Sequence, residues 1–191
     1  MGKMKLRHWR STIRATGACI DARKWLRSQE SAEKAWQSCE RGDWLLWIAA
    51  RLLTDDAGRK LVVLAACDCA ETALVHVPAG EERPRLCIDA VRAWTRGEAT
   101  IEEVRDRRGA AYAAAAAADA AYAAYADADD AAYAAAYAAA YAADAAYAAA
   151  YAAADARKAH LAKLAGVVRT RIAWGVVKVA LRVRQREVSR G

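Results

Sequence analysis

Residues 110–154 read AAYAAAAAADAAYAAYADADDAAYAAAYAAAYAADAAYAAAYAAA, and this stretch decides the fold. It consists of 32 Ala, eight Tyr and five Asp, and it contains every tyrosine of the protein. Alanine is the best helix former because it loses no side-chain entropy on ordering, and neither Gly nor Pro interrupts the run. The composition therefore predicts helix throughout the stretch.

The tyrosines gather on one side of this predicted helix. At about 100° per residue, all eight fall within an arc of roughly 160°, together with most of the aspartates. The opposite face is almost pure alanine, and methyl-sized side chains allow two helix axes to approach closely. We therefore expect the alanine face to be packed, while the tyrosine–aspartate face covers neighbouring helices or binds a partner. The candidate partner-binding residues on that face are Tyr122, Tyr125, Tyr133, Tyr137, Tyr141, Tyr147, Tyr151, Asp129, Asp130 and Asp144.

A single helix over the stretch would be about 68 Å long at ~1.5 Å per residue, which is long for a compact domain of this size. Asp127, Asp129 and Asp130 offer the best place for a break, because Asp is weak in helix interiors and a good N-cap. We expect two antiparallel helices that meet near residues 127–130. One long helix is the competing interpretation.

The scarcity of turn-forming residues predicts an all-α fold for the whole chain. Among 191 residues there are two prolines and ten glycines, and in the absence of Phe the seven Trp must supply much of the bulky core. We predict one domain over residues 1–191, a bundle of about seven to nine helices. Residues 1–16 would be a loose basic lead, residues 110–165 the alanine-rich helices and residues 166–191 a basic C-terminal helix.

The N-terminal half carries two helix-start signals. One helix is expected over much of residues 10–28 and a second over residues 31–39, with Ser31 as its N-cap. Asp43 would cap the next helix, residues 44–50, which is apolar nearly all round and therefore buried.

Further signals follow in the central part of the chain. Pro84 suits the first turn of a helix, and Gly97 suits a left-handed C-terminal cap. Thr100 and Glu103 have the spacing of a capping box, in which hydroxyl and carboxylate satisfy each other's backbone amides. Beyond the alanine-rich stretch, we expect breaks at Gly166 and Gly175.

Charge is distributed unevenly along the chain, whose net charge is +7. Residues 1–27 have a net charge of +7 and residues 157–191 of +9, whereas residues 109–155 contain six Asp and no basic residue. Basic ends could contact nucleic acid, or could pair with the acidic centre of the same chain. Nucleic acid therefore stays an alternative partner, and a homo-oligomer packed through the alanine face is another.

The cysteines indicate a cytoplasmic protein. Five Cys without regular spacing are typical of reduced thiols rather than of a disulfide framework. No segment has the apolar length of a signal peptide or a membrane span, so we expect no membrane partner.

No residue pattern indicates catalysis or a cofactor. Cys67, Asp68 and Cys69, with Cys87 and His76 nearby in sequence, are the most site-like group. However, thiols two residues apart on a helix point about 200° apart, which suits one ion poorly. We expect small buried thiols there, no metal, no cofactor and no enzyme activity.

Several sequence blocks together resemble a family. These are DWLLW at 43–47, KLVVLAACDCA at 60–70, RPRLCIDAVRAWTRGEATIEEVR at 83–105, the alanine-rich stretch, and VVRTRIAWGVVKVAL at 167–181. In this order they resemble a bacterial family of alanine-rich immunity-like proteins associated with polymorphic-toxin systems. The chain departs from the usual pattern near its C-terminus, where Ala173, Gly175 and Lys178 make the last helix more basic.

The resemblance implies a non-enzymatic protein that binds and neutralises a toxin or another effector. Two alternatives remain: an inhibitor of a bacterial defence system encoded by a mobile element such as a phage, and a nucleic-acid-associated basic helical protein.

Overall fold

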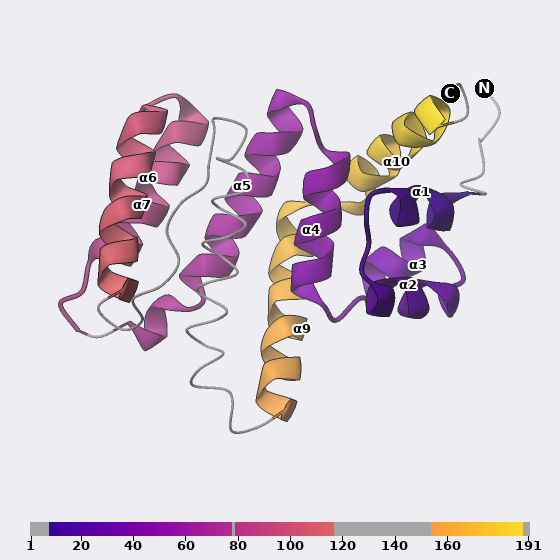
Figure 1. The fold of residues 1–191 in the computed structure, drawn as a ribbon, viewed down its shortest axis with the longest axis horizontal. Helices are drawn as coiled ribbons and strands as arrows, with labels where there is room; N and C mark the ends of the chain where they lie inside the picture. The colour runs from indigo at the N-terminus through magenta and orange to yellow at the C-terminus, as the bar shows by residue number, and fades with distance from the viewer. Residues whose placement is uncertain (1–7, 78, 117–153, 189–191) are drawn as a thin grey trace. The chain divides into compact units, whose positions relative to one another are not determined.

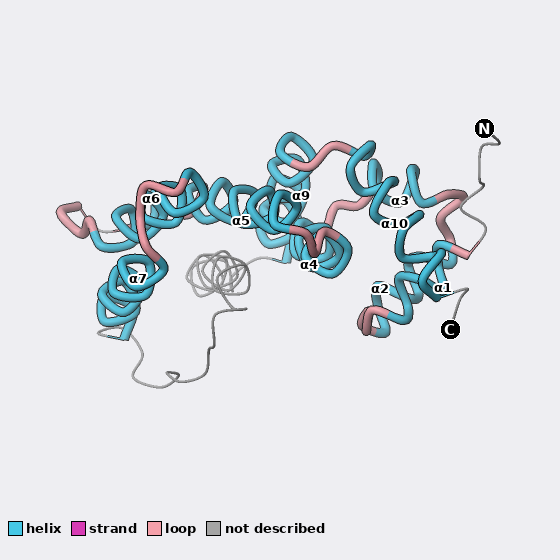
Figure 2. The backbone as a smooth tube through the Cα atoms, turned by 90° about the horizontal axis from the view of Figure 1, so that it is seen from above, coloured by secondary structure: helices cyan, strands magenta, loops and turns pink. Residues whose placement is uncertain are grey.

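The computed structural model describes residues 8–77, 79–116 and 154–188, and all regular structure in these ranges is helical (Figures 1 and 2). The all-α prediction is therefore confirmed. With the labels of Figure 1, the elements are α1 (Trp9–Ala15), α2 (Ile20–Arg27), α3 (Ala32–Ser38), α4 (Gly42–Leu52), α5 (Asp56–Glu71), the 3-10 helix η1 (Leu74–His76), α6 (Arg83–Arg96), α7 (Ile101–Ala116), α9 (Ala154–Arg171) and α10 (Trp174–Val188).

Three of the predicted capping signals, at Ser31, at Thr100 with Glu103 and at Gly97, are confirmed. Ser31 Oγ accepts a hydrogen bond from Lys34 N at 3.1 Å and caps α3. At the start of α7, Glu103 N donates to Thr100 Oγ1 at 3.1 Å and Thr100 N donates to Glu103 Oε2 at 2.6 Å, which is the predicted capping box. Gly97 ends α6 with φ +78°, in the left-handed region.

The single helix expected over much of residues 10–28 is in fact two helices. Gly17 has φ +92°, a left-handed conformation that ends the helical path and separates α1 from α2. The chain restarts at Cys19, whose Sγ accepts a hydrogen bond from Ala22 N at 3.5 Å. The sequence analysis did not predict this break, although a glycine such as Gly17 is the usual residue for a left-handed helix end.

Asp43 does not cap α4, contrary to prediction. The helix begins two residues earlier than predicted, at Gly42, with Arg41 in the N-cap position. The Asp43 carboxylate instead accepts from Arg41 Nε at 2.8 Å and from Arg41 Nη2 at 2.5 Å. The guanidinium gives this carboxylate two charge-assisted hydrogen bonds with matched geometry, and these replace the bond to a backbone amide that a cap would make.

Gly166 does not break a helix either, because α9 continues through it to Arg171. The break lies near Gly175, at residues 172–173, and α10 starts at Trp174. Packing of the buried residues Ala165 and Val168, both 0% exposed, stabilises α9 and outweighs the propensity cost of about 1 kcal/mol for one glycine.

The described residues fall into two compact units, Met1–Arg59 with Lys158–Gly191, and Lys60–Arg157. In the first unit, α9 packs close to α4, and Arg169 Nη1 donates to the carbonyl oxygens of Cys39 at 2.7 Å and Trp36 at 3.3 Å. The buried side chains include Leu45, Ile172 and Leu181. This unit is the scaffold of the cavity described below.

In the second unit, α6 and α7 run side by side, joined by the short turn after Gly97 (Figure 1). Arg92 on α6 reaches α5, where Nη2 lies 2.7 Å from Glu71 Oε2 and 3.0 Å from Asp68 Oδ1. The single-domain prediction for residues 1–191 stays a prediction. The expected hairpin near residues 127–130, and its alternative of one long helix, lie outside the described residues.

Candidate functional site

The predicted tyrosine–aspartate face lies outside the described residues. This applies to all ten candidate positions: Tyr122, Tyr125, Tyr133, Tyr137, Tyr141, Tyr147, Tyr151, Asp129, Asp130 and Asp144. The structure therefore leaves this partner-binding surface a prediction. Among the described residues, two other regions bring potentially functional side chains together.

The first place is the cysteine-rich part of α5 and α6. Cys67, Cys69 and Cys87 are all buried. Burial raises the pKa of Cys67 and of Cys69 to about 12, and that of Cys87 above its usual value. These thiols are therefore neutral at pH 7, which makes them poor nucleophiles and poor metal ligands.

The carboxylates beside these cysteines are held by Arg92. Its guanidinium donates to Asp68 and Glu71, and the hydrogen bond from Arg92 is the main reason why the pKa of Glu71 is lowered. The side chains of Arg92 and Asp68 are 24% and 19% exposed, so this pair is partly shielded from water. Within the ranges that the structure describes, no group of three His, Cys, Asp or Glu side chains could hold a metal ion. The arrangement is structural: it fastens α6 to α5.

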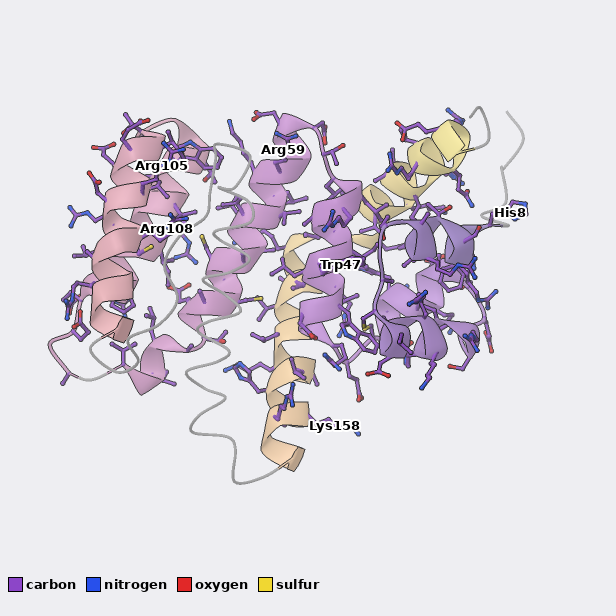
Figure 3. All side chains as sticks on the ribbon, viewed as in Figure 1. His8, Trp47, Arg59, Arg105, Arg108 and Lys158 are labelled. Carbon is purple, nitrogen blue, oxygen red and sulfur yellow. The ribbon has the colours of Figure 1, made fainter. Side chains whose placement is uncertain are left out.

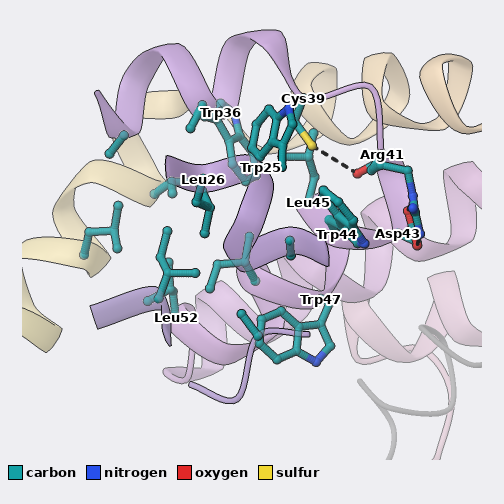
Figure 4. Close-up of a pocket in the computed structure, with 18 of the residues that line it drawn as sticks. Trp25, Leu26, Trp36, Cys39, Arg41, Asp43, Trp44, Leu45, Trp47 and Leu52 are labelled. Carbon is teal, nitrogen blue, oxygen red and sulfur yellow. Dashed lines mark hydrogen bonds and ion pairs between the residues drawn. The ribbon is translucent and has the colours of Figure 1, made fainter. Parts of the chain in front are cut away.

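The second place is a cavity of about 450 Å³ in the first unit, which we call the indole cavity (Figure 4). Its wall is formed by α1–α4 and α10 and is largely apolar, with five of the seven tryptophans. The lining residues are Ile13, Gly17, Ala18, Cys19, Ala22, Trp25, Leu26, Ala32, Ala35, Trp36, Cys39, Arg41, Asp43, Trp44, Leu45, Trp47, Ile48, Leu52, Trp174, Val177 and Leu181.

Aromatic contacts organise one wall of the indole cavity. The rings of Trp25 on α2 and Trp44 on α4 lie 6.0 Å apart at 59°, a tilted arrangement that favours aromatic pairs. Arg41 stacks on Trp44 with its guanidinium carbon 4.4 Å from the ring centroid. Because Asp43 binds the same guanidinium, one residue cluster fixes the orientation of the Trp44 ring (Figure 4).

Arg51 and Trp47 make a second cation–π contact on α4, in which the guanidinium carbon lies 5.7 Å from the ring centroid. Figure 3 shows Trp47 at the side of this helix. Trp47 is half-buried, whereas Leu45, Ile48 and Leu52 on the same helix are buried. The helix is thus apolar nearly all round, as predicted, with its indoles at the cavity.

Two of the tryptophans that line the indole cavity have an indole nitrogen without a partner among the described residues. These atoms, Nε1 of Trp36 and Nε1 of Trp174, are buried and are shielded from solvent, that in the cavity included. Other polar groups there are satisfied: the Cys39 thiol donates to the Arg41 carbonyl oxygen at 3.6 Å. Buried donors usually have an acceptor, and leaving one without costs about 1–3 kcal/mol.

The indole cavity is partly open to solvent, so solvent or a ligand can occupy it, and its volume is in the size range of small-molecule sites.

Comparison with known proteins gives one family match. Residues 52–178, more than half of the chain, match the model of the family described as "Imm-5 like putative immunity protein". The chain belongs to this family. No curated protein and no solved structure matches it in the corresponding comparisons. Membership confirms the resemblance predicted from the sequence blocks and assigns an immunity-type function.

The Imm-5 like match covers the cysteine-rich part of α5 and the Arg92 cluster but little of the indole cavity. Of the residues that line the cavity, only Leu52, Trp174 and Val177 fall within residues 52–178. The family match therefore assigns no role to this cavity.

Sequence reasoning treated the tryptophans as core and missed the indole cavity. One signal could have indicated it: Trp25, Trp36, Trp44 and Trp47 fall within 23 residues on short helices, which is more indole surface than such helices cover on their own. Arg41 and Asp43, placed two residues apart beside Trp44, are the other part of that signal.

Proposed function

We propose that this chain is a non-enzymatic inhibitor that binds and neutralises a toxin protein. The observation that carries the proposal is the match of residues 52–178 to the Imm-5 like family. Inhibition of this kind requires a stable complementary surface and no chemistry. The chain's cysteines and carboxylates fit such a role, since the thiols of Cys67 and Cys69 are neutral and Glu71 is held by Arg92.

The tyrosine–aspartate face is our proposed contact surface. Tyrosine gives a large, rigid contact area with a polar tip at small entropic cost, which is why binding surfaces favour it. Residues 109–155 contain six Asp and neither Lys nor Arg, so a basic surface on the toxin would complement them. This support comes from the sequence alone.

Protection of cells is the direct test of this function. The chain is co-expressed with a candidate toxin, sought first among the proteins encoded by neighbouring genes, and growth is compared with that of cells expressing the toxin alone. We expect growth to be restored and a complex of the two proteins to be recovered. If the chain gives no protection and no complex, the proposal is wrong.

A triple variant locates the contact surface. Tyr133, Tyr137 and Tyr141 are changed together to Ala, and in a matched control the same three are changed to Phe, which keeps the rings. We expect the Ala variant to bind at least about tenfold more weakly and the Phe variant to keep most of the affinity. An Ala variant that is folded by circular dichroism and protects fully would place the contact elsewhere.

Several expectations remain predictions: cytoplasmic localisation, a homo-oligomer, nucleic-acid binding through the basic ends, and inhibition of a bacterial defence system. Among the described residues, the structure contains no helix with the length and apolar character needed to cross a membrane.

A further inference from the structure

The charged and thiol side chains that line the indole cavity are already engaged with the protein. Arg41 donates to both oxygens of Asp43, from Nε at 2.8 Å and from Nη2 at 2.5 Å. The Cys39 thiol donates to the carbonyl oxygen of Arg41, and Sγ of Cys19 accepts from Ala22 N. Nearly all other lining residues are aromatic or aliphatic. The wall therefore offers a ligand apolar surface rather than free hydrogen-bonding side chains.

The same pairing leaves no uncompensated charge in the lining. The hydrogen bond from Arg41 to Asp43 is the main reason why the pKa of Arg41 is raised, so the two opposite charges stand together at ordinary pH. Burial raises the pKa of the Cys39 thiol, which is therefore neutral. A charged ligand would lose hydration on entering an apolar space, and no unpaired counter-ion of the lining would compensate for that loss. An uncharged ligand carries no such cost.

Water is a poor occupant of such a space. A buried water molecule typically makes about three hydrogen bonds, and partners for them are scarce on these walls. An apolar molecule that displaces poorly bonded water gains free energy from the water released and from the burial of its own surface. Because the cavity is partly open to solvent, a small molecule has a route into it.

Accessible indole rings favour an aromatic ligand over an aliphatic one. Trp25, Trp44 and Trp47 border the cavity and are half-buried, so part of each side chain stays accessible (Figure 4). Trp25 and Trp44 already form a tilted aromatic pair at 6.0 Å. A further flat ring packed against these indoles gains affinity beyond the area it buries, by about two- to tenfold.

From this lining we infer that the indole cavity is a binding site for a small uncharged aromatic molecule. Its rings pack against Trp25, Trp44 and Trp47, and any polar group that it carries stays at the open side of the cavity, in water. A volume of about 450 Å³ accommodates a bicyclic aromatic body. The inference does not rest on toxin neutralisation, because it is read out with the purified chain alone.

The test is isothermal titration calorimetry of the full chain with four probes built on one skeleton. These are the neutral 2-(1-naphthyl)ethanol, the anionic 1-naphthaleneacetate, the cationic 2-(1-naphthyl)ethylamine and the neutral alcohol with both rings saturated. We expect saturable binding of the naphthyl alcohol with a Kd on the order of 10 µM. Both charged probes should bind at least about tenfold more weakly, and the saturated alcohol at least about twofold more weakly.

Three results of this titration would overturn the inference. Without saturable binding of the naphthyl alcohol, the cavity is not a site for such a molecule. If either charged probe binds as tightly as the naphthyl alcohol, the lining does not select for an uncharged ligand. If the saturated alcohol binds as tightly, the indole rings do not select for an aromatic one.

Four variants locate the bound probe. Ala22→Leu fills part of the cavity from α2 and should abolish binding; Leu is close to Ala in helix propensity, and Ala22 is half-buried, so the helix should tolerate the change. Trp25→Leu and Trp47→Leu each remove one ring and keep an apolar side chain, and at least one of them should weaken binding about threefold or more. Trp94→Leu on α6 is the matched control and should bind as wild type, because Trp94 is also half-buried but does not border the cavity.

Folding of each variant is checked by circular dichroism and by its melting temperature. If one of the Trp→Leu variants unfolds, the other and Ala22→Leu still decide the outcome. Wild-type affinity for the naphthyl alcohol in a folded Ala22→Leu protein would show that the probe binds elsewhere. Wild-type affinity in every folded Trp→Leu variant of the cavity would show that the indole rings do not hold it. Each of these two results contradicts the inference.

Discussion

Gly42 and Leu164 lie so close together that a Cβ added at position 42 would stand 2.5 Å from Leu164 Cβ. It would also stand 2.7 Å from the backbone atoms Ala165 N and Leu164 C. Close approach of this kind requires glycine, because a helix backbone does not move aside as the end of a flexible side chain does. The start of α4 is thereby fixed against α9.

We predict that Gly42→Ala lowers the free energy of unfolding by at least about 3 kcal/mol, since the added methyl group overpacks two backbones. The measurement is urea unfolding followed by tryptophan fluorescence. Gly109→Ala is the matched control, because a Cβ there meets nothing within 4 Å and position 109 is in the interior of α7. It should raise stability by about 0.5–1 kcal/mol. Equal effects of the two substitutions would contradict the close approach.

Arg92 should make stability depend on pH through Glu71. The folded-state pKa of Glu71 is lowered, mainly by its hydrogen bond from Arg92, so its contribution is fully present above the unfolded-state pKa of about 4.3. It is lost as the pH falls from about 4.3 through the lower folded-state pKa. Because the Glu71 side chain is 46% exposed, solvent screening limits this contribution to under about 1 kcal/mol.

Replacement of Arg92 by Met tests this cluster. We expect a loss of about 1–2 kcal/mol at pH 7, because Asp68 and Glu71 lose their hydrogen bonds from Arg92, and a flatter decline of stability below about pH 4.3. Arg83→Met is the control: Arg83 pairs with Glu81, two residues away, at an exposed position, and its loss should leave stability almost unchanged. An Arg92→Met protein with the wild-type pH profile would show that the cluster does not stabilise the fold.

Thiol reactivity provides a third prediction. Of the five cysteines, Cys19 is exposed and the other four are buried. We expect one thiol to react rapidly with Ellman's reagent in the native protein at pH 8, and all five in the unfolded protein, because buried neutral thiols are inert. In the Cys19→Ser variant the rapid reaction should disappear. Rapid reaction of Cys67 or Cys69 would contradict the burial that keeps them neutral.

The capping box at α7 provides a fourth prediction. Thr100→Ala removes the acceptor for Glu103 N and should destabilise the protein by about 1 kcal/mol, whereas Thr100→Ser keeps the hydroxyl and should retain most of the stability. Thermal unfolding by circular dichroism measures both. Equal melting temperatures of the two variants would mean that the cap contributes nothing.

The features that could be predicted from the sequence are those decided within one turn of helix. The Ser31 cap, the box of Thr100 and Glu103, and the left-handed Gly97 each depend on neighbours three or four residues away. The helical class follows from composition. Such signals can be predicted because their partners are adjacent in the chain.

The features that could not be predicted depend on partners far apart in the chain. Gly166 resembles a break but lies in a helix held by packing. Asp43, which resembles a cap but is bound by Arg41, is the exception, because its partner is only two residues away. The indole cavity requires α10 beside α1–α4, so Trp36 and Trp174 meet at one volume across more than a hundred residues. No local pattern encodes that arrangement.

The most direct test of the proposed function is a titration of toxin activity with increasing amounts of this chain. A binder without chemistry of its own removes toxin in proportion, so we predict that residual activity falls linearly and reaches zero at a fixed stoichiometric ratio when both proteins are well above the Kd. Activity should return when the complex is dissociated by a denaturant and the toxin is refolded alone. Loss of toxin activity at far below stoichiometric amounts, or toxin that stays inactive after separation, would show that the chain acts as an enzyme and would contradict the account.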